Sequence, residues 1–284
     1  METFELRYFL GVARTQNIHK ASEELHVSPG SLSKAVTRLE EELSVKLFSR
    51  EGRNIRLTEQ GKLLQRRASE IVQLEESTRL EIAGIEGSIQ IQIAGAEILL
   101  TKWGLDFCES IRKDYPLAQF VFHATDDKTA IEKVERGEAH FAIVTSDVST
   151  NGELSFKNIG ETMFKTFVGN GHPLYKKKKN VPVEELLQHG FVSPNHPLLG
   201  KVGNKQSLDG WRDDQFPRKI QYLSSSLKIL EEIVSNGKAV AYLPEYFGKS
   251  LNLETLQVSG CPYTCHQKIK IAARNPKELK WLNW

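Results

Sequence analysis

The stretch "QNIHKASEELHVSPGSLSKAVTRLEEEL", residues 16–43, decides how the first part of the chain folds. Asn17 can cap one short helix, and a second helix follows in which apolar residues recur at spacings of four and three. These apolar positions are Leu32, Val36, Leu39 and Leu43. Two helices joined by a short turn, the second with basic and hydroxyl side chains on its other face, are typical of a helix-turn-helix.

The second helix opens on Ser28, Pro29 and Gly30. The Ser28 hydroxyl can accept from backbone N–H groups, and proline suits the first helical position because an N–H there would have no partner within the helix. Glycine adds no bulk, so this helix end can approach a groove wall or a phosphate group of DNA closely. Donors for DNA follow along the exposed face of the helix: Ser31, Ser33, Lys34, Thr37 and Arg38.

A hairpin is predicted next, because two short apolar pieces flank a turn at residues 51–54. Basic side chains in and around it are placed to contact the DNA backbone: Lys46, Arg50, Arg53 and Arg56. The alternative is that the basic and hydroxyl side chains are ordinary solvated residues of a helical protein-interaction domain. Charge sorting argues against it, because residues 40–42 at the far end of the second helix are all glutamate.

A long helix is predicted from residue 59 to about residue 83, with Thr58 at its start. One rough stripe of its surface combines Leu64, Ala68, Ile71, Thr78, Ile82 and Ile85. A single helix of this length cannot bury such a stripe alone, so we expect it to pair with a second chain.

Strands and helices alternate from residue 87 onward, which favours a parallel α/β sheet. Strands are predicted at residues 87–95, 118–125, 139–146, 164–170, 190–194, 239–244 and 268–274, and helices at residues 99–113, 128–137, 225–237 and from 277 on. We expect two α/β units with a cleft between them.

Composition excludes several classes of protein. The sequence contains no run of about 18 apolar residues that could span a membrane. The first residues do not have the pattern of a secretory signal, so we expect a cytoplasmic protein without a membrane partner. The three cysteines are an odd number, and Cys261, Cys265 and His266 do not have the spacing of a metal site. The net charge of +2 means that any affinity for nucleic acid must come from local clustering.

Five sequence blocks, in order, resemble the N-terminal region of LysR-type transcriptional regulators. They are Ala21-Ser22-Glu23-Glu24-Leu25, Leu32-Ser33-Lys34, Arg38-Leu39-Glu40, Leu47-Phe48-Ser49-Arg50 and Leu57-Thr58-Glu59-Gln60-Gly61. The resemblance continues more weakly along nearly the whole chain, at Gly87-Ser88-Ile89, "GEAHFAIV" (137–144), "GNGHPL" (169–174) and "GKAVAYLP" (237–244).

The resemblance implies an α/β multi-domain chain. Residues 1–58 would form a winged helix-turn-helix, and residues 59–86 a linker helix that pairs two subunits. Residues 87–284 would form a periplasmic-binding-protein-like effector domain of two α/β subdomains, the first at about 87–160 and 266–284 and the second at about 161–265.

The function implied is that of a bacterial transcriptional regulator. It would bind double-stranded operator DNA as a homodimer or homotetramer and respond to a small-molecule effector, with RNA polymerase as a further candidate partner. The competing interpretation is an α/β enzyme or a small-molecule-binding protein with an interaction-only N-terminal domain. No GxSxG, P-loop, HExxH or strand-linked GxGxxG motif is present, so we expect neither catalysis nor a cofactor.

Two positions depart from the family pattern. His140 stands where an aspartate is more usual, and Ser28-Pro29-Gly30 replaces a serine-glutamine-proline whose amide side chain is often implicated in base contact. Sequence reading is therefore expected to shift toward Ser33, Lys34 and Arg38.

Effectors are expected where strand ends from both expected subdomains meet, near the hinge. Most candidate residues follow predicted strands, and Ser224 and Ser225 precede a predicted helix. The candidates are Gly95, Ala96, Glu97, Thr145, Ser146, Ser193, Asn195, Ser224 and Ser225. Hydroxyls and backbone donors at a helix start favour an anion such as a carboxylate, whereas Glu97 would repel an anion or select an amine. The alternative for each residue is plain turn capping.

Overall fold

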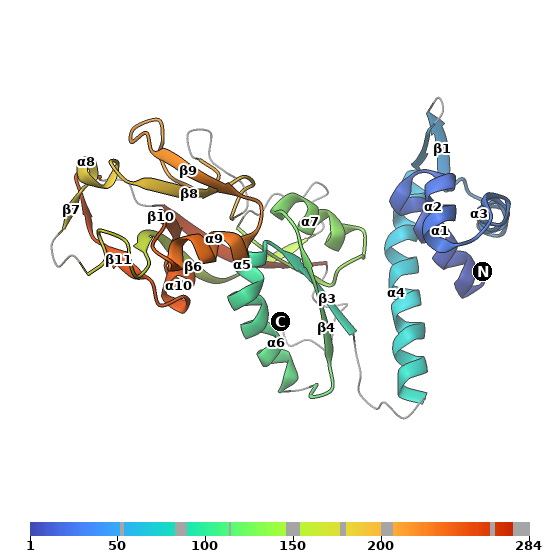
Figure 1. The fold of residues 1–284 in the computed structure, drawn as a ribbon. Helices are drawn as coiled ribbons and strands as arrows, with labels where there is room; N and C mark the ends of the chain where they lie inside the picture. The colour runs from blue at the N-terminus through green and yellow to red at the C-terminus, as the bar shows by residue number, and fades with distance from the viewer. Residues whose placement is uncertain are drawn as a thin grey trace. The chain divides into compact units, whose positions relative to one another are not determined.

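The computed structural model describes residues 1–51, 54–82, 90–113, 115–145, 154–176, 180–199, 207–261 and 265–274. The chain divides into two compact units (Figure 1). One consists of residues 1–92, 108–121 and 132–140, and the other of residues 93–107, 122–131 and 141–284.

Helices and one hairpin make up the N-terminal part of the first unit. They are α1 (Thr3–Thr15), α2 (Ile18–Leu25), α3 (Pro29–Leu43), β1 (Phe48–Glu51), β2 (Asn54–Leu57) and α4 (Glu59–Ile82). The Asn17 side chain accepts from the backbone N–H groups of His19 and Lys20, as its predicted capping role requires. Ser28 caps α3 in the same way, by accepting from the N–H of Ser31. The predicted helix-turn-helix and hairpin are therefore confirmed.

The core of this part lies between α1, α3 and α4. Its buried residues are Leu6, Phe9, Ala13, Leu39, Leu47, Ala68 and Val72. A second buried cluster of Val12, Ala21 and Leu32 joins α1, α2 and α3. Gly61 allows close contact between α4 and the segment leading into β1, since an added Cβ would lie 2.1 Å from the Leu47 carbonyl oxygen. The hairpin and the helix-turn-helix are thus fixed to the first turns of the long helix.

The expected apolar stripe of α4 divides between two faces. Ala68 is buried and Leu64 packs against the core, whereas Ile71, Thr78 and Ile82 are exposed. Ile85 lies outside the described residues. The exposed apolar residues of α4 follow a stripe of their own: Leu63, Ile71, Leu74 and Ile82. The sequence pattern merged the two faces because they are adjacent on the helix.

A mixed β-sheet is built from the later strands. They are β3 (Gln90–Gly95), β4 (Gln119–Ala124), β5 (Phe141–Val144), β6 (Ser155–Val168), β8 (Gly190–Pro194), β9 (Lys219–Ser224), β10 (Val240–Pro244), β11 (Glu254–Leu256) and β13 (His266–Ala273). The strand order is β4-β3-β5-β13-β6-β10-β8-β9, with β11 paired to β6. β3 runs parallel to β5, and β8 runs parallel to β9 and β10.

The alternation of strands and helices had predicted a parallel sheet. The observed sheet is mixed instead. β13 is antiparallel to β5 and β6, and β10 is antiparallel to β6. The reason is that the chain passes from one half of the sheet to the other on the long strand β6 and returns on β13, so these two strands run side by side in opposite directions.

Helices follow most of these strands. They are α5 (Glu97–Leu99), the π-helical turn η1 (Leu100–Gly104), α6 (Leu105–Arg112), α7 (Asp127–Glu135), α8 (Val183–Leu186), α9 (Leu227–Ser235) and α10 (Glu245–Ser250). The small strands β7 (Val181–Pro182) and β12 (Val258–Ser259) pair with each other. The sequence pattern missed β7, β9, β11, β12, α8 and α10, and the helix expected from residue 277 lies outside the described residues.

Three further features that the sequence raised are His140, the cysteines and the lack of an apolar membrane span. His140 is buried, and its Nδ1 accepts from the Gln92 N–H at 2.9 Å, so it is a hydrogen-bonded residue at a strand start. Cys108, Cys261 and Cys265 are free thiols. In the described part of the chain, no helix is long and apolar enough to cross a membrane, and no cluster of residues has the make-up of a metal site.

Candidate functional site

The start of α3 is built by its first residues. The Ser28 hydroxyl accepts from the Ser31 N–H at 3.2 Å and lies 2.9 Å from the Ser31 hydroxyl, while Pro29 occupies the first helical position. Nothing crowds Gly30, since an added Cβ would meet only the Ser28 hydroxyl oxygen, at 4.0 Å. The helix end is therefore slim and faces open space, although the protein's own packing does not require a glycine there.

One face of α3 is exposed along its length. It carries Gly30, Ser31, Lys34, Thr37 and Arg38, and the neighbouring Ser33 is half-buried. The opposite face, with Leu32, Ala35 and Leu39, is buried in the core. The residues expected to meet DNA thus share one surface, which a helix in a major groove would present to base edges and phosphates.

Arg38 is held at its base by a buried carboxylate. Its Nε lies 3.3 Å from Glu5 Oε1, and the Glu5 side chain is only 1% exposed, whereas that of Arg38 is 65% exposed. Glu5 also accepts from the Glu2 backbone N–H at 2.9 Å, within a capping box of α1. The ion pair contacts Arg38 through Nε, while most of the Arg38 side chain remains exposed.

Lys46 has a structural partner that the sequence did not suggest. Its ammonium lies 2.6 Å from Glu40, which also accepts from the backbone N–H groups of Leu47 and Phe48. Burial tends to raise the pKa of Glu40, but the hydrogen bonds from Lys46 and the backbone outweigh burial and lower that pKa. Glu40 therefore holds the first residues of the hairpin to the end of α3.

The arginines of the hairpin lie on different faces. Arg50 pairs with Ile55 and Ser49 pairs with Arg56, and residues directly opposite each other share one face of the ribbon. Arg50 and Arg56 therefore point to opposite sides, and both are exposed. Arg53 lies outside the described residues.

A cavity of about 290 Å³ lies within the second unit. Ends of strands β3, β4, β8 and β9 and starts of helices α5 and α9 form it. Its lining residues are Ala96, Glu97, Ile98, Ala124, Thr125, Asp126, Pro194, His196, Pro197, Leu198, Ser224, Ser226, Leu227 and Leu230. Of the expected effector residues, Ala96, Glu97 and Ser224 line it, and Ser146 lies outside the described residues.

The other expected effector residues are absent from this lining, and Ser225 is exposed beside it. Gly95 serves the sheet, because an added Cβ would lie 2.4 Å from the Ile143 carbonyl oxygen. Thr145 donates to Asp127 through its N–H at 2.8 Å and its hydroxyl at 2.9 Å.

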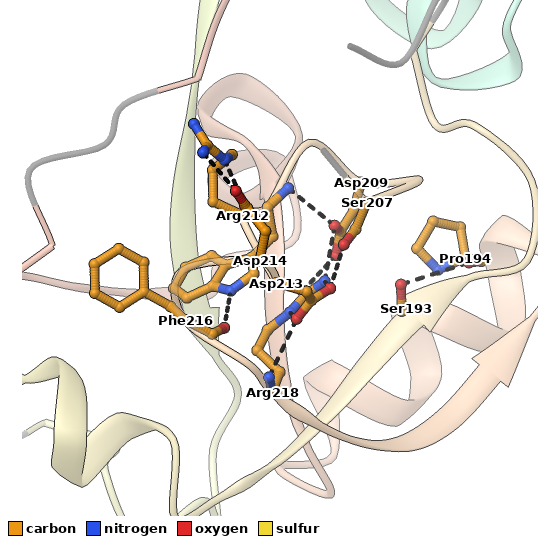
Figure 2. A network of polar contacts seen from close by, with 10 residues as sticks. Ser193, Pro194, Ser207, Asp209, Arg212, Asp213, Asp214, Phe216 and Arg218 are labelled. Atoms are coloured by element: carbon orange, nitrogen blue, oxygen red, sulfur yellow. Dashed lines mark hydrogen bonds and ion pairs between the residues drawn. The ribbon is translucent and has the colours of Figure 1, made fainter. Parts of the chain in front are cut away.

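Ser193 and Asn195 make hydrogen bonds within and between the neighbouring strands β8 and β9. Ser193 is buried and its hydroxyl faces the Pro194 carbonyl at 3.5 Å (Figure 2), while the Asn195 N–H donates to the Ser224 carbonyl at 3.0 Å. Turn and strand geometry accounts for both residues.

The serine hydroxyls at the cavity are used by their own turn. Ser224 donates to the Ser226 carbonyl at 2.9 Å and accepts from the Ser226 N–H at 3.1 Å. Ser226 in turn caps α9 by accepting from the Ile229 N–H at 3.4 Å. The Ser224 O–H is thus used within its own turn, whereas the Ser226 hydroxyl is used only as an acceptor.

Two carboxylates line the same cavity. Glu97 is exposed, and within the described part of the chain its carboxylate makes no hydrogen bond or ion pair. Asp126 caps α7 by accepting from the Thr129 N–H at 3.1 Å and the Thr129 hydroxyl at 2.7 Å. Burial would raise the pKa of Asp126, but these hydrogen bonds and other backbone N–H groups outweigh it and lower that pKa. Sequence reasoning missed Asp126, although an aspartate between a strand and a helix is a signal for such a cap.

A buried arginine organises the chain beside this cavity (Figure 2). Arg218 is fully buried and donates to Asp209 at 2.7 and 3.1 Å and to Asp213 at 3.0 and 2.8 Å. Its guanidinium also lies over the rings of Phe191 and Trp211, at 5.3 and 5.2 Å. Burial would lower the pKa of Arg218, but the two aspartates outweigh it and raise that pKa.

The arginine network connects to the cavity wall through the backbone. The Leu208 carbonyl, next to Asp209, accepts from the N–H of the cavity residue Leu198 at 3.1 Å. Arg218 is thus a positioning residue for that wall. No local sequence pattern marks it, since its aspartate partners lie in an irregular segment.

Comparison with known proteins identifies the family. Residues 4–62 match "Bacterial regulatory helix-turn-helix protein, lysR family", and residues 86–279 match "LysR substrate binding domain". The chain belongs to the LysR family. This LysR-family chain is 27% identical over 251 residues to the transcriptional dual regulator GltC of Bacillus subtilis, covering 86% of this chain and 81% of GltC.

Solved structures show the same fold. A full-length variant of OxyR from Pseudomonas aeruginosa matches with a TM-score of 0.61 and 21% identity, over 99% of this chain and 93% of that one. Full-length CbnR, solved in complex with its target DNA, matches with a TM-score of 0.56 and 18% identity, over 99% of this chain and 97% of that one.

The family match confirms the resemblance carried by the five sequence blocks. The protein is a LysR-family DNA-binding transcriptional regulator with an N-terminal helix-turn-helix and an effector-binding domain. This result also confirms the expected fold class of a helix-turn-helix followed by an α/β effector domain.

Proposed function

We propose that this regulator reads operator DNA with the exposed face of α3 and that a small molecule in the cavity of the second unit alters this binding. The proposal rests mainly on the separation of polar and apolar side chains between two faces of α3. Lys34, Thr37 and Arg38 are exposed together, while the apolar residues of the same helix are buried. The hairpin would contact the flanking phosphates through Arg50, Arg53 and Arg56.

The assembled form would be a homodimer or a homotetramer. Support comes from α4, where Leu74 and Ile82 are 68% and 82% exposed on one stripe with Leu63 and Ile71. A second copy of α4 would cover these side chains, and each Leu or Ile buried in this way contributes about 1.5–3 kcal/mol. Two paired helices would also hold two copies of α3 at a fixed separation, which recognition of two half-sites requires.

Fluorescence anisotropy with duplex DNA from the region upstream of the protein's own gene tests the DNA part. Lys34→Ala should weaken binding by about tenfold and make the dependence on salt less steep, as loss of one phosphate contact predicts. Lys62→Ala, which removes an exposed cation of α4 paired with Glu59, serves as the matched control and should leave binding unchanged. Equal effects of the two substitutions would assign Lys34 to nonspecific charge alone.

Sedimentation analysis tests the assembly. Leu74→Glu should dissociate the oligomer, because it would place two charges in the paired helices, and it should weaken DNA binding as a consequence. Lys62→Ala should remain assembled. An unchanged sedimentation coefficient for Leu74→Glu would exclude α4 as the pairing surface.

A further inference from the structure

The polar groups of the cavity in the second unit differ in whether they are already used. Ser224 and Ser226 are bonded within their own turn, and the Arg218 donors are taken by Asp209 and Asp213. Among the described lining residues there is neither lysine nor arginine. A ligand with only a carboxylate would therefore meet no lysine or arginine there, and the one imidazole of the lining, that of His196, is engaged with the Asn195 side chain through Nδ1 at 3.1 Å.

The two acidic groups differ from the serines because each carries a negative charge, and Glu97 also has no local partner within the described residues. Glu97 begins α5 on one wall, and within the described residues its carboxylate has no partner. Asp126 precedes the first residue of α7 and lines the same cavity, and the bonds from Thr129 stabilise its ionised form. Two oxygen-bearing anions thus line a cavity whose other walls are mostly apolar, through Ile98, Pro194 and further aliphatic residues.

We propose that the effector carries a protonated amino group, which Glu97 and Asp126 bind at the mouth of the cavity while its carbon chain lies against the apolar walls. This inference rests on the proposed function, because it takes the cavity to be the effector site. An ammonium group supplies three donors and one positive charge, which match two carboxylates better than any neutral group does. The cavity of about 290 Å³ is small, which suits a compact aliphatic amine.

The test uses three probes of equal carbon-chain length with the full-length protein. Butylammonium, γ-aminobutyrate and butyrate are added at about 10 mM and constant ionic strength, and the shift in Tm gives the affinity of each. Butylammonium and γ-aminobutyrate should raise Tm, and butyrate should not. Stabilisation by butyrate equal to that by butylammonium would overturn the proposal, and so would the absence of stabilisation by both amines.

Variants assign the effect to the two carboxylates. Glu97→Gln and Asp126→Asn should each weaken amine binding by about tenfold, and asparagine keeps the cap of α7 so that folding is retained. Glu254→Gln removes a carboxylate of the same unit that lies outside the cavity lining, and it should leave the Tm shifts unchanged. Glu97→Lys should lose the amines and gain stabilisation by butyrate. Amine binding that is insensitive to both Glu97→Gln and Asp126→Asn would overturn the proposal.

The same samples separate this inference from the proposed function. If the wild-type protein binds its DNA but no amine stabilises it, the amine inference fails and the regulator function stands. If it binds amines through Glu97 but shifts no duplex DNA, the proposed DNA binding fails and the ligand assignment stands.

Discussion

Arg38 and Arg218 are both ion-paired arginines, but one is largely exposed and the other is buried. The Arg218 side chain is completely buried between two aspartates and two aromatic rings. Arg38 has one buried carboxylate at its base and is 65% exposed. In the second unit, buried aspartates neutralise the charge of Arg218 inside the fold. On α3, the ion pair with Glu5 leaves most of the Arg38 side chain exposed. Ion pairing alone therefore does not distinguish a structural arginine from one proposed to bind DNA; the exposure of the side chain separates the two.

The largest expected effect comes from removing the buried arginine. Arg218→Met leaves Asp209, itself fully buried, without its cation, and such a loss costs about 3–5 kcal/mol. Chemical unfolding followed by the fluorescence of Trp211, which packs on the guanidinium, would measure it. Lys228→Met is the control, because Lys228 is 73% exposed and pairs with Glu231 and Glu232 at the surface, so its loss should cost far less than that of Arg218. Similar losses for the two variants would show that burial does not set the strength of the pair.

A buried histidine sharpens the same contrast through pH. His172 accepts from the Leu174 N–H, lies 5.0 Å from the His189 ring, and has a pKa lowered to about 4 by burial and by His189. Between about pH 6.5 and pH 4 the unfolded chain binds a proton that the folded chain does not, so stability falls as pH falls through this window.

Between about pH 6.5 and pH 4, the free energy of unfolding should change by about 1 kcal/mol per pH unit in unfolding experiments. His172→Asn retains an acceptor for the Leu174 N–H and should flatten the slope. A slope that persists in this variant would trace the pH dependence to other groups.

The features that the sequence predicted correctly are local patterns, whereas those it missed depend on contacts without a periodic signal. The caps at Asn17 and Ser28, the buried face of α3 and the hairpin are local patterns, and the structure confirms them. The Arg218 network joins residues up to nine positions apart in irregular chain, without a periodic signal. Of the residues predicted for the effector site, Ala96, Glu97 and Ser224 line the cavity; the first two come just after β3, and Ser224 ends β9. The predicted residues Thr145 and Ser193 do not line the cavity, and no pattern in the sequence shows the local hydrogen bonds that Thr145 and Ser224 make.

Removing the charge of Glu5, which pairs with Arg38, should have a smaller effect, on DNA affinity. Glu5→Gln keeps the acceptor for the Glu2 N–H but removes the charge that pairs with Arg38. We expect DNA affinity to fall by about threefold with the salt dependence unchanged, because the cation is still present. Arg38→Ala should lower affinity more and reduce the salt slope by about 1. If Glu5→Gln changes nothing in anisotropy titrations, Arg38 does not need its ion pair with Glu5.

Gly30 gives the smallest change in stability and the cleanest separation of folding from binding. A Cβ at this position meets open space, so Gly30→Ala should leave the protein equally stable or more stable by less than about 1 kcal/mol. The same methyl group would lie at the exposed end of α3, where close approach to DNA is expected, and should weaken DNA binding. Thermal unfolding and anisotropy titration of one preparation measure both quantities. Raised stability with reduced affinity would mean that the glycine serves the DNA and not the fold, whereas unchanged affinity would remove this helix end from the DNA-contacting surface.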